Sequence, residues 1–247
     1  MEKFVKTQDF KNLNVGFALD EGMASPNDEF LLYYGERSIW HVFIHCPGTP
    51  GHGSLMLPDT AGEKVEIIIN RFMDLRRKEK AKLESNKNLT VGDVTTINLT
   101  QIKGGVQPNV VPPELVVGFD CRLATNVNHT DFEKMIEGWC REAGPGTYME
   151  FVQKNNFVPN TRLDNSNPWW QAFKRECDEI NVKLKPSIFP GGTDSRYVGE
   201  VGIPALGFSP IVNTPVLLHD HDEFLNEKVF LEGIKIYERI ITAVANV

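Results

Sequence analysis

Two imidazoles and three carboxylates crowd into residues 217–223 (LLHDHDE) near the C-terminal end of the chain. A second acidic pair, Asp20 and Glu21, closes the apolar run at residues 15–19. Zinc in proteins is bound by about four ligands drawn from His, Cys, Asp and Glu. The two segments therefore predict either a metal site or two charged turns. Their few ligands make it hard to complete a site from these segments alone.

The elements between residues 36 and 155 are read from hydrophobic periodicity. Residues 39–46 alternate as a strand does, and residues 58–84 carry an apolar stripe at helical spacing. Thr130 and Glu133 have the spacing of a capping box, which predicts that a helix opens there. The remaining predicted strands are residues 94–102, 115–122 and 148–153. The order β-α-β-β-α-β predicts an inserted ferredoxin-like α+β domain over residues 36–155.

The two flanks of this domain alternate between strand and helix patterns. Strands are predicted at residues 13–19, 30–34, 187–189 and 205–208, and helices from residue 165 to 180 and from 226 to 245. This alternation is typical of an α/β layer. Residues 1–35 and 156–247 are therefore predicted to be two segments of one α/β domain, which looks incomplete because it begins abruptly and has few strands.

Composition excludes several function classes. The net charge of −7 and the pI near 5.4 argue against a nucleic-acid partner. No apolar stretch reaches the roughly 20 residues that span a bilayer, and the first 15 residues do not have the pattern of a signal peptide. The four cysteines form no Cys-x-x-Cys pair, which favours buried thiols in a reducing cytoplasm. We therefore expect a cytoplasmic protein with no membrane partner.

Four motifs in a fixed order resemble one family: FALDEG at residues 17–22, GTPGHG at 48–53, GGVxxNV at 104–110 and LHDHDE at 218–223. Together they resemble the zinc metallopeptidase family that contains the aminoacylases, acetylornithine deacetylase and related carboxypeptidases. The resemblance covers essentially the whole chain. It implies a homodimeric hydrolase with two zinc ions per complete site, which converts N-acyl-L-amino acids to a carboxylate and a free L-amino acid. It also implies that the inserted domain is the dimerisation domain and that the flanks belong to the zinc-peptidase-like catalytic domain.

The resemblance assigns roles to individual residues. Glu21 and His219 match zinc ligands, one for each ion. His52 matches a histidine that reaches into the partner subunit's active site and polarises the scissile carbonyl. The substrate-binding positions that it implies are Asn109, Arg122, Gly192, Thr193 and Arg196.

The residues themselves support these roles unevenly. Arg122 lies on the strand face opposite Val117 and Phe119, where a bidentate fork can bind a carboxylate, but a solvated charge at a strand end is the alternative. The glycines beside His52 expose its ring, although a histidine in a loop is more often merely exposed. Residues 191–196 also suit an ordinary polar turn, and Glu21 alone suits the end of a strand.

The histidine-containing segment at residues 217–223 has two interpretations. In an extended segment His219 and His221 would share a face, and the resemblance selects His219 alone as a ligand. His221 would then orient a neighbour or have a structural role. Asp222 and Glu223 also suit the positive N-terminal end of the final helix.

The family's other metal-binding motifs are absent from this sequence. They comprise a His-x-Asp segment, a bridging Asp after a Gly, and a Glu-Glu-x-Gly turn that carries the general base. Residues 129–131 (HTD) match the first motif by letter, but they precede a helix, so we assign them to helix capping. We expect the 247 residues to be the C-terminal part of such an enzyme and to be inactive alone. Two alternatives stay open: a non-catalytic dimerisation module, and a dipeptidase or deacetylase of the same family. Whether Met1 is the true start is also open.

Overall fold

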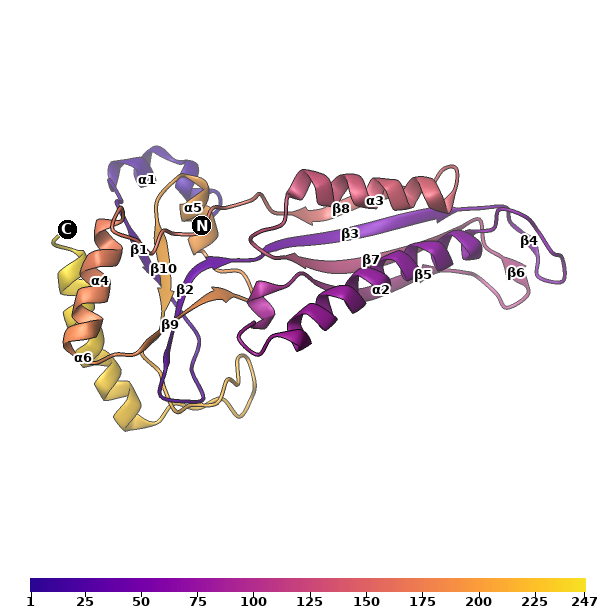
Figure 1. The fold of residues 1–247 in the computed structure, drawn as a ribbon. Coiled ribbons are helices and arrows are strands. Elements are labelled where there is room, and N and C mark those ends of the chain that lie inside the picture. The colour runs from indigo at the N-terminus through magenta and orange to yellow at the C-terminus, as the bar shows by residue number, and fades with distance from the viewer. The chain divides into compact units, whose positions relative to one another are not determined.

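A computed structural model describes every residue from Met1 to Val247. The chain forms two compact units. Unit 1 consists of residues 1–36 and 158–247, and unit 2 consists of residues 37–157. The chain therefore enters and leaves unit 2 once each, and unit 2 interrupts unit 1 in the sequence (Figure 1).

Unit 2 is an antiparallel four-stranded sheet with two helices on one face (Figure 1). Its strand order is β5-β7-β3-β8, which with the connecting helices is the ferredoxin-like arrangement that the sequence predicts. The main elements are β3 (Ser38–Pro47), α2 (Ala61–Ser85), β5 (Thr96–Gly104), β7 (Glu114–Leu123), α3 (His129–Ala143) and β8 (Tyr148–Lys154). A single turn of 3₁₀ helix (Val91–Asp93) precedes β5.

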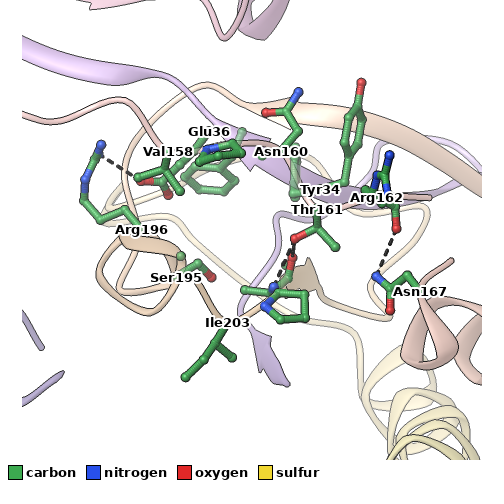
Figure 2. Close-up of a pocket in the computed structure, with 18 of the residues that line it drawn as sticks. Tyr34, Glu36, Val158, Asn160, Thr161, Arg162, Asn167, Ser195, Arg196 and Ile203 are labelled. Atoms are coloured by element: carbon green, nitrogen blue, oxygen red, sulfur yellow. Dashed lines mark hydrogen bonds and ion pairs between the residues drawn. The ribbon is translucent and has the colours of Figure 1, made fainter. Parts of the chain in front are cut away.

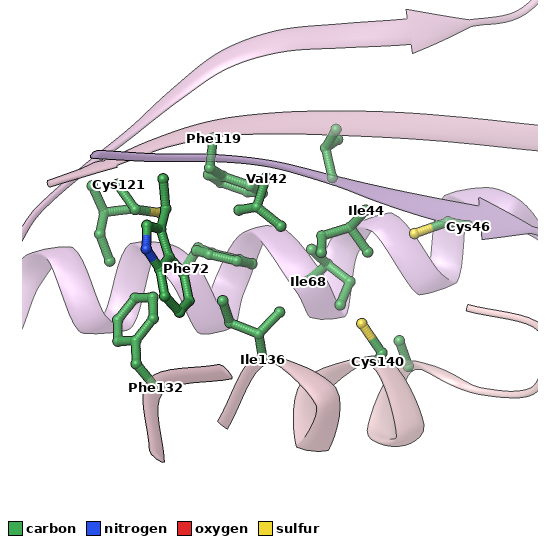
Figure 3. Packing of buried hydrophobic residues seen from close by; sticks show 14 of the residues in the cluster. Val42, Ile44, Cys46, Ile68, Phe72, Phe119, Cys121, Phe132, Ile136 and Cys140 are labelled. Atoms are coloured by element: carbon green, nitrogen blue, oxygen red, sulfur yellow. The ribbon is translucent and has the colours of Figure 1, made fainter. Parts of the chain in front are cut away.

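The core of unit 2 lies between the sheet and the two helices (Figure 3). Alternate residues of β3, from Trp40 to Cys46, are almost fully buried, as the alternation in the sequence predicts. Phe72 of α2 stacks on Phe119 of β7, with ring centroids 3.8 Å apart. This large apolar core makes unit 2 a self-contained domain.

The two helices of unit 2 begin with side-chain caps. Thr60 and Glu63 form a reciprocal capping box at the start of α2. The predicted capping box at Thr130 is wrong, because the side chain of Asn128 accepts a hydrogen bond from Asp131 N and α3 begins at His129. Asn128 lies two residues before Thr130 and is a stronger N-cap residue, so its side chain caps the free amides of the first turn.

Unit 1 is a smaller mixed sheet of order β1-β10-β2-β9. β1 pairs in parallel with β10 and has no strand on its other side, so it is an edge strand. The strands are β1 (Ala18–Asp20), β2 (Phe30–Glu36), β9 (Leu184–Phe189) and β10 (Ala205–Phe208). The helices are α1 (Gln8–Asn12), α4 (Pro168–Glu179), α5 (Ser195–Glu200) and α6 (Glu227–Val244), with a 3₁₀ turn at Phe4–Lys6.

The core of unit 1 joins the sheet to α4 and α6. Leu32, Leu206 and Phe208 from the strands pack with Phe173 of α4 and Ile240 of α6, and all five are fully buried. Burial of such large apolar side chains is the main stabilising contribution to a unit of this size. None of the helices is long and apolar enough to cross a membrane.

Two predictions for unit 1 are wrong. The strand predicted at residues 13–19 starts only at Ala18, because Leu13 instead follows the short helix α1, which is capped by Thr7. The tract treated as a polar loop at residues 193–196 opens into α5 at Ser195. Both helices have six residues or fewer, too few to show a helical hydrophobic period.

Candidate functional site

Unit 1 contains a cavity of about 390 Å³ (Figure 2). Its polar lining comes from the ends of β1 and β2, from the approach to α4, and from the start of α5. The lining includes Glu21, Thr193 and Arg196, three of the residues that the sequence singled out, and it does not include Gly192. The site-defining part of the lining consists of Glu21, Tyr34, Glu36, Asn160, Arg162, Asn167, Thr193, Ser195 and Arg196.

A buried ion pair closes one side of this cavity (Figure 2). The Nη1 atom of Arg196 lies 2.9 Å from Oε1 of Glu36, and both side chains are more than nine-tenths buried. Thr193 donates to Oε2 of Glu36 from its backbone nitrogen at 2.8 Å and from its hydroxyl at 3.0 Å. Burial raises the pKa of Glu36, and the Arg196 charge and the Thr193 bonds counteract only part of that effect. Arg196 thus borders the cavity with its charge already paired.

Asp20 and Glu21 follow each other at the end of β1. Asp20 accepts hydrogen bonds from Ser195 N at 2.9 Å and from Ser195 Oγ at 2.6 Å. Burial raises the pKa of Asp20, but its hydrogen bonds with Glu21 and Ser195 outweigh burial and leave that pKa below its usual value. The Asp20 carboxylate and burial together raise the pKa of Glu21. The two neighbouring carboxyls therefore differ in their affinity for protons.

The segment that follows Glu21 is tied to the segment that leads to His219. Gly22 N donates to Ser209 Oγ at 2.9 Å, and Ser25 exchanges backbone bonds with Ile211 and Thr214, each also at 2.9 Å. Gly22 cannot carry a side chain here, since an added Cβ would lie 2.7 Å from the backbone nitrogen of Ser209. A second cavity of about 320 Å³ opens between these two segments.

His219 occupies a turn and not an extended strand. Its φ of +62° lies in the left-handed region, so the expectation that His219 and His221 share one strand face is wrong. The residues after it, Asp220, His221 and Asp222, form one exposed group whose ligand atoms all lie within 4.8 Å of one another. Neither His219 nor Glu21 belongs to that group. Asp222 and Glu223 precede the final helix, as expected, but the cap is Asn226, whose side chain accepts from Lys228 N, and Glu227 is the acidic residue of the first turn.

His52 and Asn109 meet in a small two-stranded sheet of unit 2. β4 (Gly51–His52) pairs with β6 (Val110–Val111), and Gly53 N donates to Asn109 O at 2.8 Å. β4 and β6 form the far end of unit 2, beyond its main sheet (Figure 1). His52 is exposed, as its glycine neighbours predict, but neither glycine has a positive φ. An added Cβ on Gly51 would lie 2.7 Å from the end of the Leu57 side chain, which would have to shift.

Arg122 lies at the opposite end of the main sheet, near the residues where the chain enters and leaves unit 2. It pairs across the ladder with Ile39 of β3, while Glu114 at the start of β7 is the strand end nearer β6. At about 3.4 Å per residue, Arg122 is roughly 27 Å from Glu114 along the strand. Arg122 points away from the buried face, as predicted, and binds Asp120 with Nε at 2.7 Å and Nη2 at 2.8 Å. The three candidate residues of unit 2 are therefore divided between two places.

The sequence analysis missed Glu36 and Ser195, and it noted Asp20 only as part of the acidic pair with Glu21. Asp20 and Glu36 are the last residues of β1 and β2, so a charged residue directly after an apolar strand pattern was the available signal. Ser195 had no such signal, because its contact with Asp20 joins segments 175 residues apart.

Comparison with known proteins first indicates the class of protein to which the fold is similar. Residues 34–147 match the peptidase dimerisation domain of the M20 family, which covers most of unit 2. The fold of the whole chain is that of solved M20-type structures. Aminopeptidase PepT from Bacillus cereus superposes with a TM-score of 0.69 at 16% identity, over 98% of this chain and 60% of that one. An M20 family metallo-carboxypeptidase from Sulfolobus solfataricus gives 0.67 at 14% identity, over 100% of this chain and 67% of that one. The chain therefore contains an M20 peptidase dimerisation domain and has the fold of these solved structures.

Closer relatives narrow the assignment. The chain is 49% identical to human aminoacylase-1 and to rat aminoacylase-1A over all 247 residues, and 43% identical to aminoacylase-1 of Dictyostelium discoideum. These matches cover 100% of this chain but 60 to 62% of the relatives. The sequence fits the C-terminal part of an aminoacylase-1.

Proposed function

We propose that this chain is the C-terminal part of an N-acyl-L-amino-acid amidohydrolase that acts as a homodimer. The observation that carries the proposal is 49% identity to aminoacylase-1 over the full chain, combined with a match to a peptidase dimerisation domain. The reaction is hydrolysis of the acyl amide to a carboxylate and a free L-amino acid. The bound substrate would need a carboxylate-binding group and a donor that polarises the acyl carbonyl.

The separation of His52 from Arg122 supports a dimeric site. Both residues are on unit 2, but they belong to opposite ends of its sheet, and one N-acyl amino acid is too short to contact both in one subunit. A single substrate can contact both only where two subunits meet. We infer that His52 and Asn109 act together from one subunit. Arg122 of the other subunit, whose Nε and Nη2 are held by Asp120, binds the substrate carboxylate through its remaining N–H groups.

Zinc belongs to the complete enzyme, and the residues of this chain do not form a full zinc site. Glu21 and His219 supply one ligand to each of the two zinc ions, and each ion normally takes about four. The compact group of ligands in the structure is instead Asp220, His221 and Asp222, all exposed. No catalytic step is assigned to a metal here, and we propose that this length of chain does not hydrolyse N-acyl amino acids alone.

The completeness of unit 2 favours a second function for the chain by itself. Unit 2 has its own apolar core and matches a dimerisation domain. In unit 1, β1 pairs only with β10, so its other edge is open. An unpaired edge offers free backbone groups to another strand. The chain would then serve as a dimerisation module that donates His52 to a full-length subunit.

A complementation assay tests both functions. The acceptor is a full-length aminoacylase-1 subunit in which the histidine equivalent to His52 is replaced by asparagine, so its homodimers lack the donor. Mixing it with this chain is expected to restore hydrolysis of N-acetyl amino acids, because the heterodimer has one complete site. The chain with His52→Asn is the matched control and is expected to restore none.

Three results would contradict the proposals. Hydrolysis by the chain alone, abolished by a chelator, would contradict its inactivity. Equal rescue by the wild-type chain and by His52→Asn would contradict donation of His52. A stable heterodimer with no activity would be consistent with the dimerisation module but would contradict the proposed role of His52.

A further inference from the structure

The imidazole of His52 is held through one of its two nitrogens. The backbone N–H of Ser54 donates to Nδ1 of His52 at 3.2 Å, and the Ser54 hydroxyl lies 2.8 Å from the same atom. Both contacts join residues two apart in the sequence, within the turn that follows β4. The ring of an exposed residue is thus fixed by local bonds.

The two Ser54 contacts favour one tautomer of the His52 ring. An amide N–H can donate a hydrogen bond but cannot accept one, so it bonds Nδ1 only when that nitrogen presents its lone pair. In a neutral imidazole the proton is then on Nε2, because one ring nitrogen is a donor and the other an acceptor. The Ser54 hydroxyl can rotate to donate to the same lone pair. Nε2 of His52 therefore presents an N–H donor.

The turn around Ser54 is itself held by backbone bonds. Leu55 N donates to His52 O at 3.0 Å, which closes the turn, and Gly53 N donates to Asn109 O at 2.8 Å. An added Cβ on Gly53 would lie 3.3 Å from the carbonyl of Asn109, so the two strands approach closely there. Because the backbone on both sides is fixed, the Ser54 amide keeps its position beside Nδ1 of the ring.

We propose that Ser54 is the positioning residue of His52, and that it fixes the Nε2–H tautomer needed to donate to the substrate's carbonyl oxygen. The proposal rests on the proposed function of His52. A ring with its proton on Nδ1 would present a lone pair to that oxygen and would repel it. Ser54 does not touch the substrate; it acts through the ring.

The tautomer can be measured without any enzymatic activity. Long-range ¹H–¹⁵N correlation spectra of this chain, labelled on histidine nitrogens, separate the protonated from the unprotonated ring nitrogens. The chain has six histidines, and the signals lost in His52→Asn assign the ring. When the ring is neutral, Nδ1 is expected to show the ¹⁵N chemical shift of an unprotonated nitrogen, and Nε2 that of a protonated one. A protonated Nδ1 would overturn the proposal.

Two substitutions at Ser54 distinguish the contribution of its hydroxyl from that of its backbone amide. Ser54→Ala keeps the amide but removes the hydroxyl, so the shifts of the two ring nitrogens are expected to move toward each other as the other tautomer becomes populated. Ser54→Thr keeps both donors and is expected to retain the wild-type shifts. Unchanged shifts in Ser54→Ala would overturn the part assigned to the hydroxyl.

The complementation assay gives a catalytic readout. Loss of one neutral hydrogen bond corresponds to about a 2- to 10-fold effect, so Ser54→Ala is expected to lower kcat by that factor with KM unchanged. Ser54→Thr is expected to restore kcat. If no chain rescues activity, the proposed function fails, while the spectra still decide the tautomer. If the wild-type chain rescues activity and Ser54→Ala matches it, the catalytic part of the positioning role fails.

Discussion

Arg122 and Asp120, two residues apart on β7, form a bidentate ion pair on the open face of the unit 2 sheet, with N–O distances of 2.7 and 2.8 Å. His41 of β3 contacts the same carboxylate, with its Nε2 3.0 Å from Oδ2. Asp120 thus links two strands and holds the guanidinium that we assign to substrate binding. Removing this carboxylate affects stability and substrate affinity together.

Asp120→Asn is expected to destabilise unit 2 by about 1–3 kcal/mol at pH 7, the cost of leaving charged partners unsatisfied. Burial raises the pKa of Asp120, but the hydrogen bonds and charges of Arg122 and His41 outweigh burial and leave that pKa below its usual value. Its stabilising contribution is therefore present above the unfolded pKa and is lost as pH falls through the lower folded value. Urea unfolding measured from pH 7 to 2 should show the two stabilities converging at the acid end.

Glu66→Gln is the matched control for Asp120→Asn. Glu66 lies on an exposed face of α2 in the same unit, and its substitution is expected to change stability by less than about 0.5 kcal/mol at every pH. A stability gap for Asp120→Asn that stays constant down to pH 2 would contradict the ion-pair explanation.

Phe72→Ala is expected to destabilise unit 2 by about 3–5 kcal/mol, because Phe72 is fully buried against Phe119. Phe173→Ala, its counterpart in the core of unit 1, should weaken unit 1 to a similar degree. Native-state hydrogen exchange resolves the two effects, since each unit's strand amides report its own opening. Equal loss of protection in both units from either substitution would show that the chain unfolds as one cooperative block.

All four cysteine thiols are expected to resist alkylation in the folded chain. Each is buried, and burial raises the pKa of Cys46 and Cys177 to about 12 and that of Cys140 to about 11. Burial also raises the pKa of Cys121. Thiolate is the reactive form, so labelling at pH 8 requires unfolding. Mass spectrometry after timed alkylation measures this directly.

Ser85→Cys supplies the control for alkylation, because Ser85 is exposed at the end of α2. The added thiol is expected to react at once while the four native thiols do not. Rapid labelling of any native cysteine in this variant would show that its core opens far more often than its burial implies.

Zinc is expected to leave the unfolding midpoint of this chain almost unchanged. A complete structural zinc site contributes roughly 10–16 kcal/mol of apparent binding free energy, which two ligands cannot supply. Weak binding at the exposed group of Asp220, His221 and Asp222 should disappear in His221→Ala. Thermal unfolding with and without zinc tests this, and a large stabilisation abolished by His219→Ala would show that the chain completes a site after all.

The local elements were accessible from the sequence alone. Burial on one side of β3 follows from the alternation between Trp40 and Cys46, and α2 follows from the apolar stripe at residues 58–84, although the helix begins only at Ala61. Both signals arise from residues close together in the chain, so they can be recognised without knowledge of the fold. The start of α3 at Asn128 required choosing between two capping residues two positions apart, which local sequence does not settle.

The pairing of distant residues was decided by the tertiary structure. The Glu36–Arg196 ion pair, the Asp20–Ser195 bonds and the turn at His219 depend on how β1, β2 and α5 come together, which no local period encodes. The sequence by itself determined the residue types, the order of elements and, through its motifs, the family resemblance. Only the fold determined that Glu21, Thr193 and Arg196 line one cavity, and that His52 with Asn109 stands at the opposite end of the sheet from Arg122. The physical reason is that helix and strand periods arise from neighbouring residues, whereas a site depends on the packing of distant segments.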